Sequence, residues 1–512
     1  MAASPIVWTA PSLSRIGRND APGTSRTITI YAAKGESESF QIGVRGPASH
    51  VNVTATDFTL GSKAVIERSN VTLYREHYIA ITNASSCPHP DEPCTNPPLG
   101  AGTYPDALIP FNDPQTGAPL AGAELTAVPF SVAAGENQPL WIDVTIPRGT
   151  VAGTYKAEFT IASDQGSASV DAKLVVWNFE LPLQPALKSA FLIEHPMKAV
   201  QEELLRHRLM PKDVAPADEA ELVARFGLNI ASFPCWGGWN PQTNAPFSAD
   251  DYRSEAAKHT QGLPLICYPA DEISGATERY AQVRQWAFAM HQAGIKNLIT
   301  MQPDPALYDD GSGTGRSAVD IWVMLPFQYD QAADRVREVQ AKGDEVWSYN
   351  TLVQDNYSPK WHIDFAPINF RIQPGFISQS LHLSGLLYWR IDWAARADGQ
   401  PSDPWRDGYG MFYPGDGRMT YPGDEVGLTG GGVAPSMRLK WLRDGVDDYD
   451  YVDLLKKAGC GDAALKVARS VGQDWHTWTR DPATLEAVRI RLGNALSRGA
   501  DPSRCASLNG GD

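Results

Sequence analysis

The sequence predicts a protein of three parts: an N-terminal antiparallel β-sandwich over residues 1–182, a central (β/α)8 TIM-like barrel over residues 186–434, and a small C-terminal helical region over residues 435–512 that packs on the barrel. A chain of 512 residues is too long for one ordinary core, so two or three domains are expected. The first third has short alternating runs broken by turn residues, which is typical of antiparallel sheets. The middle alternates apolar with amphipathic runs, which is typical of parallel sheets.

Strand-like runs follow one another through the first 182 residues. They are separated by Gly, Pro, Asn and Asp, which turns prefer. The runs span residues 27–31, 39–44, 51–55, 71–74, 140–146, 154–161 and 169–179. Because this region shows no constellation of carboxylates, we expect it to support the barrel or to form a wall beside the active site.

Strands and helices alternate after a linker at residues 181–185. Seven strands are expected, at residues 190–194, 228–233, 263–270, 297–301, 319–325, 345–349 and 385–393. Helices are expected between them, at residues 199–209, 217–226, 249–259, 280–293 and 330–341. So many units favour a closed barrel over an open sheet. An eighth, degenerate strand is expected near Pro211.

Two adjacent acids follow the most strand-like run of the barrel region. Residues 263–270 are mostly apolar, Asp271 and Glu272 come next, and a glycine and a helical segment follow. In such barrels the carboxyl ends of the strands carry the chemistry. Neighbouring acids shift each other's pKa values, so that one stays protonated while the other is charged. Asp271 and Glu272 are therefore predicted to be catalytic. The alternative is a solvated pair that starts a helix.

Other strand ends supply the expected substrate pocket. A carbohydrate cleft needs flat rings against sugar faces, and acids and amides for the hydroxyl groups. The predicted substrate-binding residues are His195, Trp236, Trp239, Asp320, Trp322, Tyr349, Asn350, Trp389, Asp392 and Trp393. For any single tryptophan, a place in the core is the alternative. The Gly-, Pro- and aromatic-rich loop after Trp393 is predicted to be a lid or a subsite wall.

Charge and cysteine content narrow the function further. A net charge of -15 argues against binding nucleic acid or anionic membranes through a basic surface, and no run is long enough to span a membrane. No zinc-ligand spacing or phosphate loop occurs, so no metal or cofactor is predicted.

The spacing of Cys87 with Cys94, and of Cys460 with Cys505, fits two disulfides and an oxidising compartment. We therefore expect a secreted or periplasmic protein. Cys235 and Cys267 are expected to be buried free thiols.

Several motifs resemble those of bacterial proteins around glycoside hydrolase family 123 that carry a C-terminal domain of unknown function. The motifs are residues 34–41, 207–211, 268–272, 385–389, 416–423, 435–438 and 443–449. In that family an adjacent Asp-Glu pair on a barrel strand is catalytic, and Asp271-Glu272 matches it. Ile273 follows the pair where the family usually has proline. The charged residues from Arg438 to Tyr449 are expected to form ion pairs that dock their helix.

The resemblance implies a retaining β-N-acetylgalactosaminidase that uses substrate-assisted catalysis. In this mechanism the sugar's acetamido oxygen is the nucleophile, Asp271 orients the acetamido group, and Glu272 is the general acid and base. Two alternatives remain open. One is a glycosidase on a sugar without an acetamido group, in which Glu272 is paired with Glu194, Asp320 or Asp392. The other is a non-catalytic carbohydrate-binding protein of the cell surface.

Overall fold

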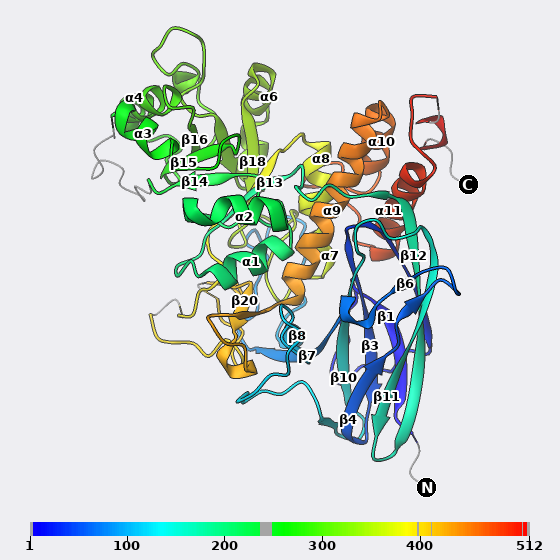
Figure 1. Cartoon of the computed structure of the whole chain (residues 1–512). Coiled ribbons are helices and arrows are strands. Elements are labelled where there is room, and N and C mark those ends of the chain that lie inside the picture. Colours follow the sequence, from blue (N-terminus) through cyan, green and yellow to red (C-terminus); the bar gives the residue numbers. More distant parts are fainter. Residues whose placement is uncertain (1–3, 236–247, 397–398, 411, 504, 509–512) are drawn as a thin grey trace.

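The N-terminal region is a sandwich of two β-sheets (Figure 1). The computed structural model describes residues 4–235, 248–396, 399–410, 412–503 and 505–508. The first sheet contains, in order, β1 (Ile6–Pro11), β3 (Ser37–Arg45), β10 (Asn137–Thr145), β7 (Val71–Ile81) and β8 (Gly102–Pro110). The second contains β2 (Thr27–Lys34), β12 (Gly166–Glu180), β11 (Gly153–Ser163), β4 (Ala48–Ala55) and β9 (Phe130–Val132), with β5 (Phe58–Thr59) and β6 (Val65–Ile66) beside it. The predicted sandwich is confirmed, with one departure: β2 pairs with β12 in parallel.

Both faces of the first sheet are buried. Phe40 and Phe159 meet edge to face in the core between the two sheets. On the opposite face, Trp141 of β10 packs against Trp441 of helix α9 (Met437–Lys457), with ring centroids 6.3 Å apart. Burial on two sides explains why seven consecutive residues of β3 are buried even though the strand includes Glu38, Ser39 and Gln41.

The central region contains a seven-stranded sheet in which every pair of neighbouring strands is parallel. Its order is β13 (Lys188–Phe191), β19 (Gly385–Tyr388), β18 (Glu345–Tyr349), β17 (Ile321–Met324), β16 (Lys296–Thr300), β15 (Leu265–Ala270) and β14 (Ala231–Phe233). All seven predicted strands are therefore present. Parallel strands are covered on both faces, so their sequences read as continuous apolar runs.

The expected eighth strand is replaced by one β-bridge. Phe191 of β13 is bridged to Pro211, with backbone hydrogen bonds to Met210 and Lys212. Ser232 of β14 hydrogen-bonds Asp213. In a flat sheet the two edge strands would lie about 29 Å apart, whereas residues 210–213 span at most about 11 Å. The sheet is therefore curled, and the described residues form a seven-stranded partial barrel rather than a closed (β/α)8 barrel.

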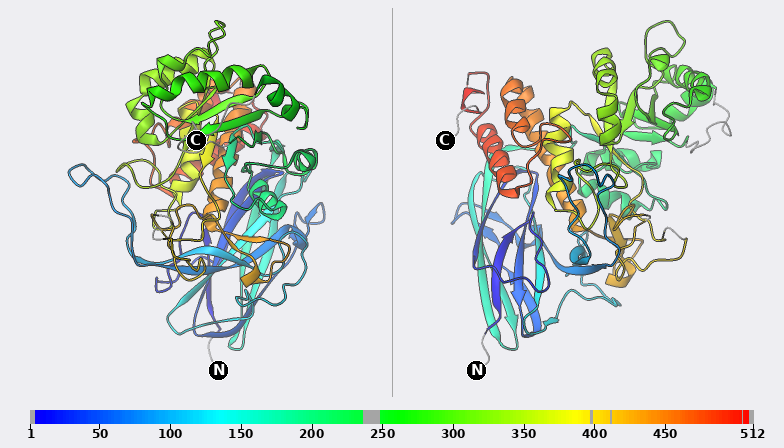
Figure 2. Two further views of the ribbon diagram at one scale, coloured as in Figure 1. Left: turned by 90° about the vertical axis from the view of Figure 1, so that its left-hand side faces the viewer. Right: turned by 180° about the vertical axis from the view of Figure 1, so that it is seen from behind.

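Helices lie around this sheet (Figure 2), and a small hairpin packs beside β8 of the sandwich. The helices are α1 (Lys198–Arg206), α2 (Pro216–Phe226), α3 (Ala249–Ala256), α4 (Tyr280–His291), α5 (Pro326–Gln331), α6 (Ala333–Lys342), α7 (Ile368–Ile372) and α8 (Ser378–Ser380). The hairpin consists of β20 (Thr420–Pro422) and β21 (Val433–Pro435).

Helix α9 joins the sandwich to the curled sheet (Figure 1). It is followed by α10 (Gly461–Arg469) and α11 (Pro482–Ser497). Arg443 of α9 binds Asp143 of the sandwich at 2.9 Å, and Arg438 binds Asp106 at 2.9 Å. Asp448 binds Arg371 of α7 at 2.7 Å. The charges predicted to dock this helix thus do so, but onto two neighbours rather than one. Across the part of the chain that the structure describes, no helix is long and apolar enough to cross a membrane.

Candidate active site

Strand β15 places Asp271 and Glu272 at the carboxyl edge of the curled sheet. The strand is buried throughout its length and ends at Ala270, so the two acids are the first residues beyond it. Because all seven strands are parallel, their carboxyl ends lie at this same edge of the sheet. Asp271 is half-buried and Glu272 is exposed.

Two hydroxyl groups hold one oxygen of Asp271. Tyr268 of β15 and Thr300 at the end of β16 each donate to Oδ1 at 2.5 Å. The two residues lie on neighbouring strands, so the sheet register brings them together. Burial raises the pKa of Asp271, and these two hydrogen bonds oppose the rise. No described residue donates to Oδ2.

The backbone and Tyr349 orient Glu272. Its φ of +48° lies in the left-handed region, which is uncommon for a residue other than glycine and typical of functional sites. Its N–H donates to Thr300 Oγ1 at 2.6 Å, so one hydroxyl holds both acids. Tyr349, the last residue of β18, donates to Glu272 Oε1 at 2.7 Å. Burial and the charge of Asp271 raise the pKa of Glu272, while the Tyr349 hydrogen bond lowers it.

Two tryptophans form a pair just beyond β19. The ring centroids of Trp389 and Trp393 are 5.5 Å apart at an interplanar angle of 51°, and both residues are half-buried. Trp389 Nε1 donates to Asp416 Oδ1 at 3.2 Å. A side chain at position 417 would clash with Trp389, because a Cβ built on Gly417 lies 2.5 Å from the ring. The Asp416-Gly417 turn therefore fixes the position of this ring.

Asp416 is a buried carboxyl group that reasoning from the sequence did not place at the site. It also accepts from Thr351 Oγ1 at 3.3 Å, two residues beyond Tyr349. Burial raises its pKa to about 6. Tyr268 and Thr300 were missed as well. In the sequence, only the Asp416-Gly417 motif pointed to Asp416. Tyr268 and Thr300 could have been noticed because each is a polar residue within a buried strand.

Three of the predicted substrate-binding residues lie elsewhere. Asp320 precedes β17 and so lies at the amino edge of the sheet, where it binds His291 at 2.9 Å. Trp322 is fully buried, and its Nε1 donates to Asp344 at 3.1 Å. Asn350 is buried and donates to Pro359 and Gln373 at 2.9 and 2.8 Å, so its amide is already used. These predictions are corrected: the first residue is at the wrong edge and the other two are internal.

Two further predicted residues, His195 and Asp392, lie near the end of β13. His195 is exposed. Asp392 accepts from Arg390 Nε at 2.5 Å, and Arg390 also pairs with Glu194. The guanidinium thus compensates both of these carboxylates. Trp236 and Trp239 lie outside the described residues.

Three disulfides occur, one of them against expectation. The predicted bonds Cys87–Cys94 and Cys460–Cys505 are present. Cys235 and Cys267, expected as free thiols, form a third bond. Cys267 lies within β15, so this bond ties the segment after β14 to the strand that leads to the acidic pair. In the described ranges, no cluster of three or more His, Cys, Asp or Glu side chains could hold a metal ion.

Comparison with known proteins relates the chain to one glycosidase family. Residues 18–163 match the family model described as the glycoside hydrolase 123 N-terminal domain. A family 123 glycoside hydrolase from Clostridium perfringens shares the fold: the TM-score is 0.66 at 13% identity, with 99% of this chain and 100% of that chain covered. A β-glucuronidase from Parabacteroides merdae aligns with a TM-score of only 0.27 at 10% identity, over 79% of this chain and 51% of that one. A comparison with curated proteins gives no match.

Both of the first two findings support the glycoside hydrolase class predicted from the sequence. The chain therefore contains a segment similar to the N-terminal domain of glycoside hydrolase family 123 and shares the fold of one member of that family over its whole length.

Proposed function

We propose that this protein is a retaining glycoside hydrolase that acts on a 2-acetamido sugar, such as a β-linked N-acetylgalactosamine, by substrate-assisted catalysis. One observation carries the proposal. Asp271 and Glu272 follow each other at the carboxyl end of β15. Each has one oxygen that accepts hydrogen bonds from hydroxyl groups, two in Asp271 and one in Glu272, and one oxygen to which no described residue donates. Two oriented acids with one available oxygen each can act on two neighbouring atoms of a substrate.

In this proposal Asp271 binds the acetamido group. Tyr268 and Thr300 donate to Oδ1, which favours the charged form and leaves Oδ2 to accept the acetamido N–H. A carboxylate at this position turns the acetamido oxygen toward the anomeric carbon. Its negative charge then stabilises the positive charge that develops on the oxazolinium ring.

Glu272 is the general acid and then the general base. Its raised pKa favours the protonated form, and it gives this proton to the glycosidic oxygen as the bond to the anomeric carbon breaks and the acetamido oxygen bonds to that carbon. The carboxylate next removes a proton from water, which attacks the anomeric carbon and opens the oxazolinium ring. Two displacements retain the configuration. The exposure of Glu272 lets water reach it.

The tryptophan pair offers a surface for the sugar. Trp389 follows β19, the neighbour of the strand that carries Tyr349. A sugar face stacks on such a ring by burying its C–H groups. Because Asp416 and Gly417 fix the Trp389 ring, the surface is formed before the substrate arrives.

The structure disfavours the other glycosidase mechanism. It would need a second catalytic carboxylate opposite Glu272. Asp320 is at the other edge of the sheet, and Glu194 and Asp392 share Arg390. A non-catalytic binding protein, in turn, would have no need for two adjacent acids held by three hydroxyl groups.

Aryl glycosides test the proposal directly. We expect cleavage of an aryl β-N-acetylgalactosaminide, no cleavage of the matching aryl β-galactoside, and inhibition by an oxazoline mimic. Glu272→Gln should abolish turnover while sparing binding. Cleavage of only the galactoside would reject the acetamido mechanism. If no member of a broad glycan panel were hydrolysed, the chain would be a binding protein.

The proposal includes a glycan as partner and an exported location. The Clostridium perfringens relative hydrolyses glycolipid glycans, so a glycan of that kind belongs in the panel. Three disulfides fit an oxidising compartment.

A further inference from the structure

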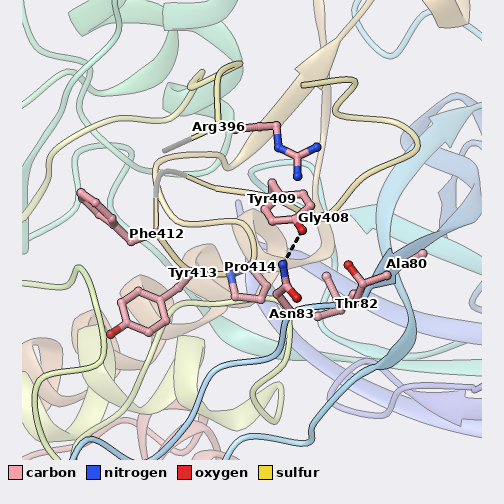
Figure 3. A pocket seen from close by; sticks show the side chains of 10 residues that line it. Ala80, Thr82, Asn83, Arg396, Gly408, Tyr409, Phe412, Tyr413 and Pro414 are labelled. Atoms are coloured by element: carbon pink, nitrogen blue, oxygen red, sulfur yellow. Dashed lines mark hydrogen bonds between the residues drawn. The ribbon is translucent and has the colours of Figure 1, made fainter. Parts of the chain in front are cut away.

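A cavity of about 260 Å³ lies between the end of β7 and the loop that follows β19. The sandwich contributes residues 80–83, and the loop contributes Arg396 and residues 408–414 in part (Figure 3). Its volume is below the roughly 300–1,000 Å³ of pockets that take drug-sized ligands, which suits a single sugar ring. None of these residues belongs to the machinery described above.

The cavity is a built feature of the fold. Asp407 forms a parallel bridge with Ala80 at the end of β7, and Gly408 N–H donates to Ala80 O at 3.3 Å. A Cβ on Gly408 would lie 2.1 Å from Ile81 Cδ1, so a larger residue would require that side chain to shift. On the loop, Tyr409 accepts a hydrogen bond from the Asn83 amide. The two walls are thus held together by backbone and side-chain bonds.

Arg396 is the only cation among the residues that line this cavity in the described part of the chain. Its guanidinium lies over the Tyr409 ring, 4.1 Å from the centroid, as Figure 3 shows. No carboxylate of the described residues is within ion-pair distance of it. In contrast, the nearby Arg390 and Arg406 are paired with Asp392 and Asp403. An arginine stacked by its flat face keeps its N–H edge for a planar anion, which it binds through two hydrogen bonds.

Aromatic and amide groups complete the cavity. Phe412 is 60% exposed, although apolar rings of this size are normally buried. Tyr413, beside it, stacks on His362 with centroids 5.3 Å apart. The Asn83 carbonyl has no donor among the described residues. Rings for a sugar face, an amide for hydroxyl groups and an uncompensated guanidinium together match a sugar that carries an anionic group.

The loop also connects this cavity with the proposed active site. Tyr413 and Pro414 line the cavity, and Asp416, two residues later, accepts the hydrogen bond from Trp389. Arg396 itself lies three residues beyond Trp393. The cavity is therefore next to the tryptophan pair at the carboxyl edge of the sheet.

We propose that this cavity, defined by Asn83, Arg396, Tyr409, Phe412 and Tyr413, is a subsite for an anionic sugar of the glycan, carrying a carboxylate or a sulfate group. This inference rests on the proposed function. The anion binds Arg396, and the sugar ring contacts the exposed aromatic side chains. On a chain with a net charge of -15, this uncompensated guanidinium gives an acidic glycan a local positive charge to bind.

Binding to the Glu272→Gln chain tests the subsite without turnover. The probes share one core containing N-acetylgalactosamine, next to which lies galactose, galacturonate or galactose 6-sulfate. We expect at least one acidic probe to bind roughly tenfold more tightly than the galactose probe, a difference of about 1.4 kcal/mol. The tighter of the two acidic probes identifies the group. Added salt should reduce the preference.

Variants of two arginines complete the test. Arg396→Gln should remove most of the tenfold preference, and Arg396→Lys, which keeps the charge but not the planar fork, should remove part of it. Arg406→Gln, the matched control, removes a charge of the same loop and should leave the preference unchanged. Thermal unfolding checks that each variant is folded. Equal binding of the three probes, or an unchanged preference in Arg396→Gln, would overturn the subsite.

Hydrolysis separates this inference from the proposed function. Cleavage of the aryl N-acetylgalactosaminide by the unaltered chain, without any preference for acidic probes, would remove only the subsite. A preference for acidic probes in a chain that cleaves no glycoside would remove only the hydrolase.

Discussion

Tyr349 donates a hydrogen bond of 2.7 Å to Glu272, although 77 residues separate them in the chain. Two strands, β16 and β17, lie between the strands that carry them. Only a curled sheet brings such residues within contact at its edge, because neighbouring strands are about 4.8 Å apart. This contact links the shape of the sheet to the protonation of the proposed acid.

Replacing Tyr349 by phenylalanine should raise the pKa of Glu272. The lost hydrogen bond favours the charged carboxylate, so its removal favours the protonated form. The alkaline limb of kcat/KM, where the acid loses its proton, should move to higher pH, and activity at neutral pH should fall about tenfold as orientation is lost. Tyr308→Phe, whose hydroxyl contacts Glu338 instead, is the matched control. An unmoved limb would contradict the assignment of Glu272.

Replacing Thr300 by valine should disturb both acids at once. The hydroxyl donates to Asp271 and accepts the Glu272 N–H. Without it the pKa of Asp271 should rise, so the acid limb of the pH profile should move to higher pH. We expect kcat/KM to fall by roughly 10–100-fold and the free energy of unfolding to drop by about 1–3 kcal/mol, because an N–H loses its acceptor. Thr300→Ser keeps the hydroxyl and should restore most of both.

The half-buried acid Glu345 should make stability depend on pH in the acidic range. Lys188 and Lys296 bind it at 2.8 and 2.6 Å and help to lower its pKa to about 2. A lowered pKa contributes stability above the unfolded value and loses it as the pH falls toward the folded one. The contribution of about 3 kcal/mol should therefore be complete above pH 4.5 and vanish near pH 2.

Denaturant unfolding of Glu345→Gln at several pH values checks this expectation. The variant should be less stable than the unaltered chain at pH 7, and the difference should shrink as the pH falls toward 2. A difference that stays constant with pH would show that the ion pair is not its cause.

Breaking the disulfide between Cys235 and Cys267 should reduce both stability and activity. Closing a loop with this separation of 32 residues stabilises a fold by about 3–4 kcal/mol in the chain-entropy description. Because Cys267 is in the strand that carries Asp271 and Glu272, the Cys235→Ser, Cys267→Ser chain should also lose turnover. The Cys87→Ser, Cys94→Ser chain is the control, because that bond closes a shorter loop, of separation 7, between β7 and β8. Equal effects in the two chains would contradict the special place of the first bond.

Reasoning from the sequence located the strands more accurately than it predicted on which face of the sheet each side chain lies. The predicted run at residues 345–349 coincides with β18. The run at 319–325 was too long by two residues at its start, which moved Asp320 from the amino edge of the sheet into the strand. Trp322 was misplaced for a different reason. A strand buried on both faces has no alternation of polar and apolar residues, so its sequence does not show which side faces a pocket.

Local patterns in the sequence by themselves determined the order of the strands and helices, the position of the acidic pair at the end of β15, and two of the three disulfides. Those features depend on local sequence patterns: apolar runs, turn residues, and cysteines that flank a Pro-rich loop or bracket a helical region. The tertiary structure alone decided that Tyr268, Thr300 and Tyr349 hold the two acids, that Asp416 anchors Trp389, and that Cys235 meets Cys267. Each of these depends on the register and curl of the sheet, which arise from packing between distant segments and leave no periodic pattern along the chain.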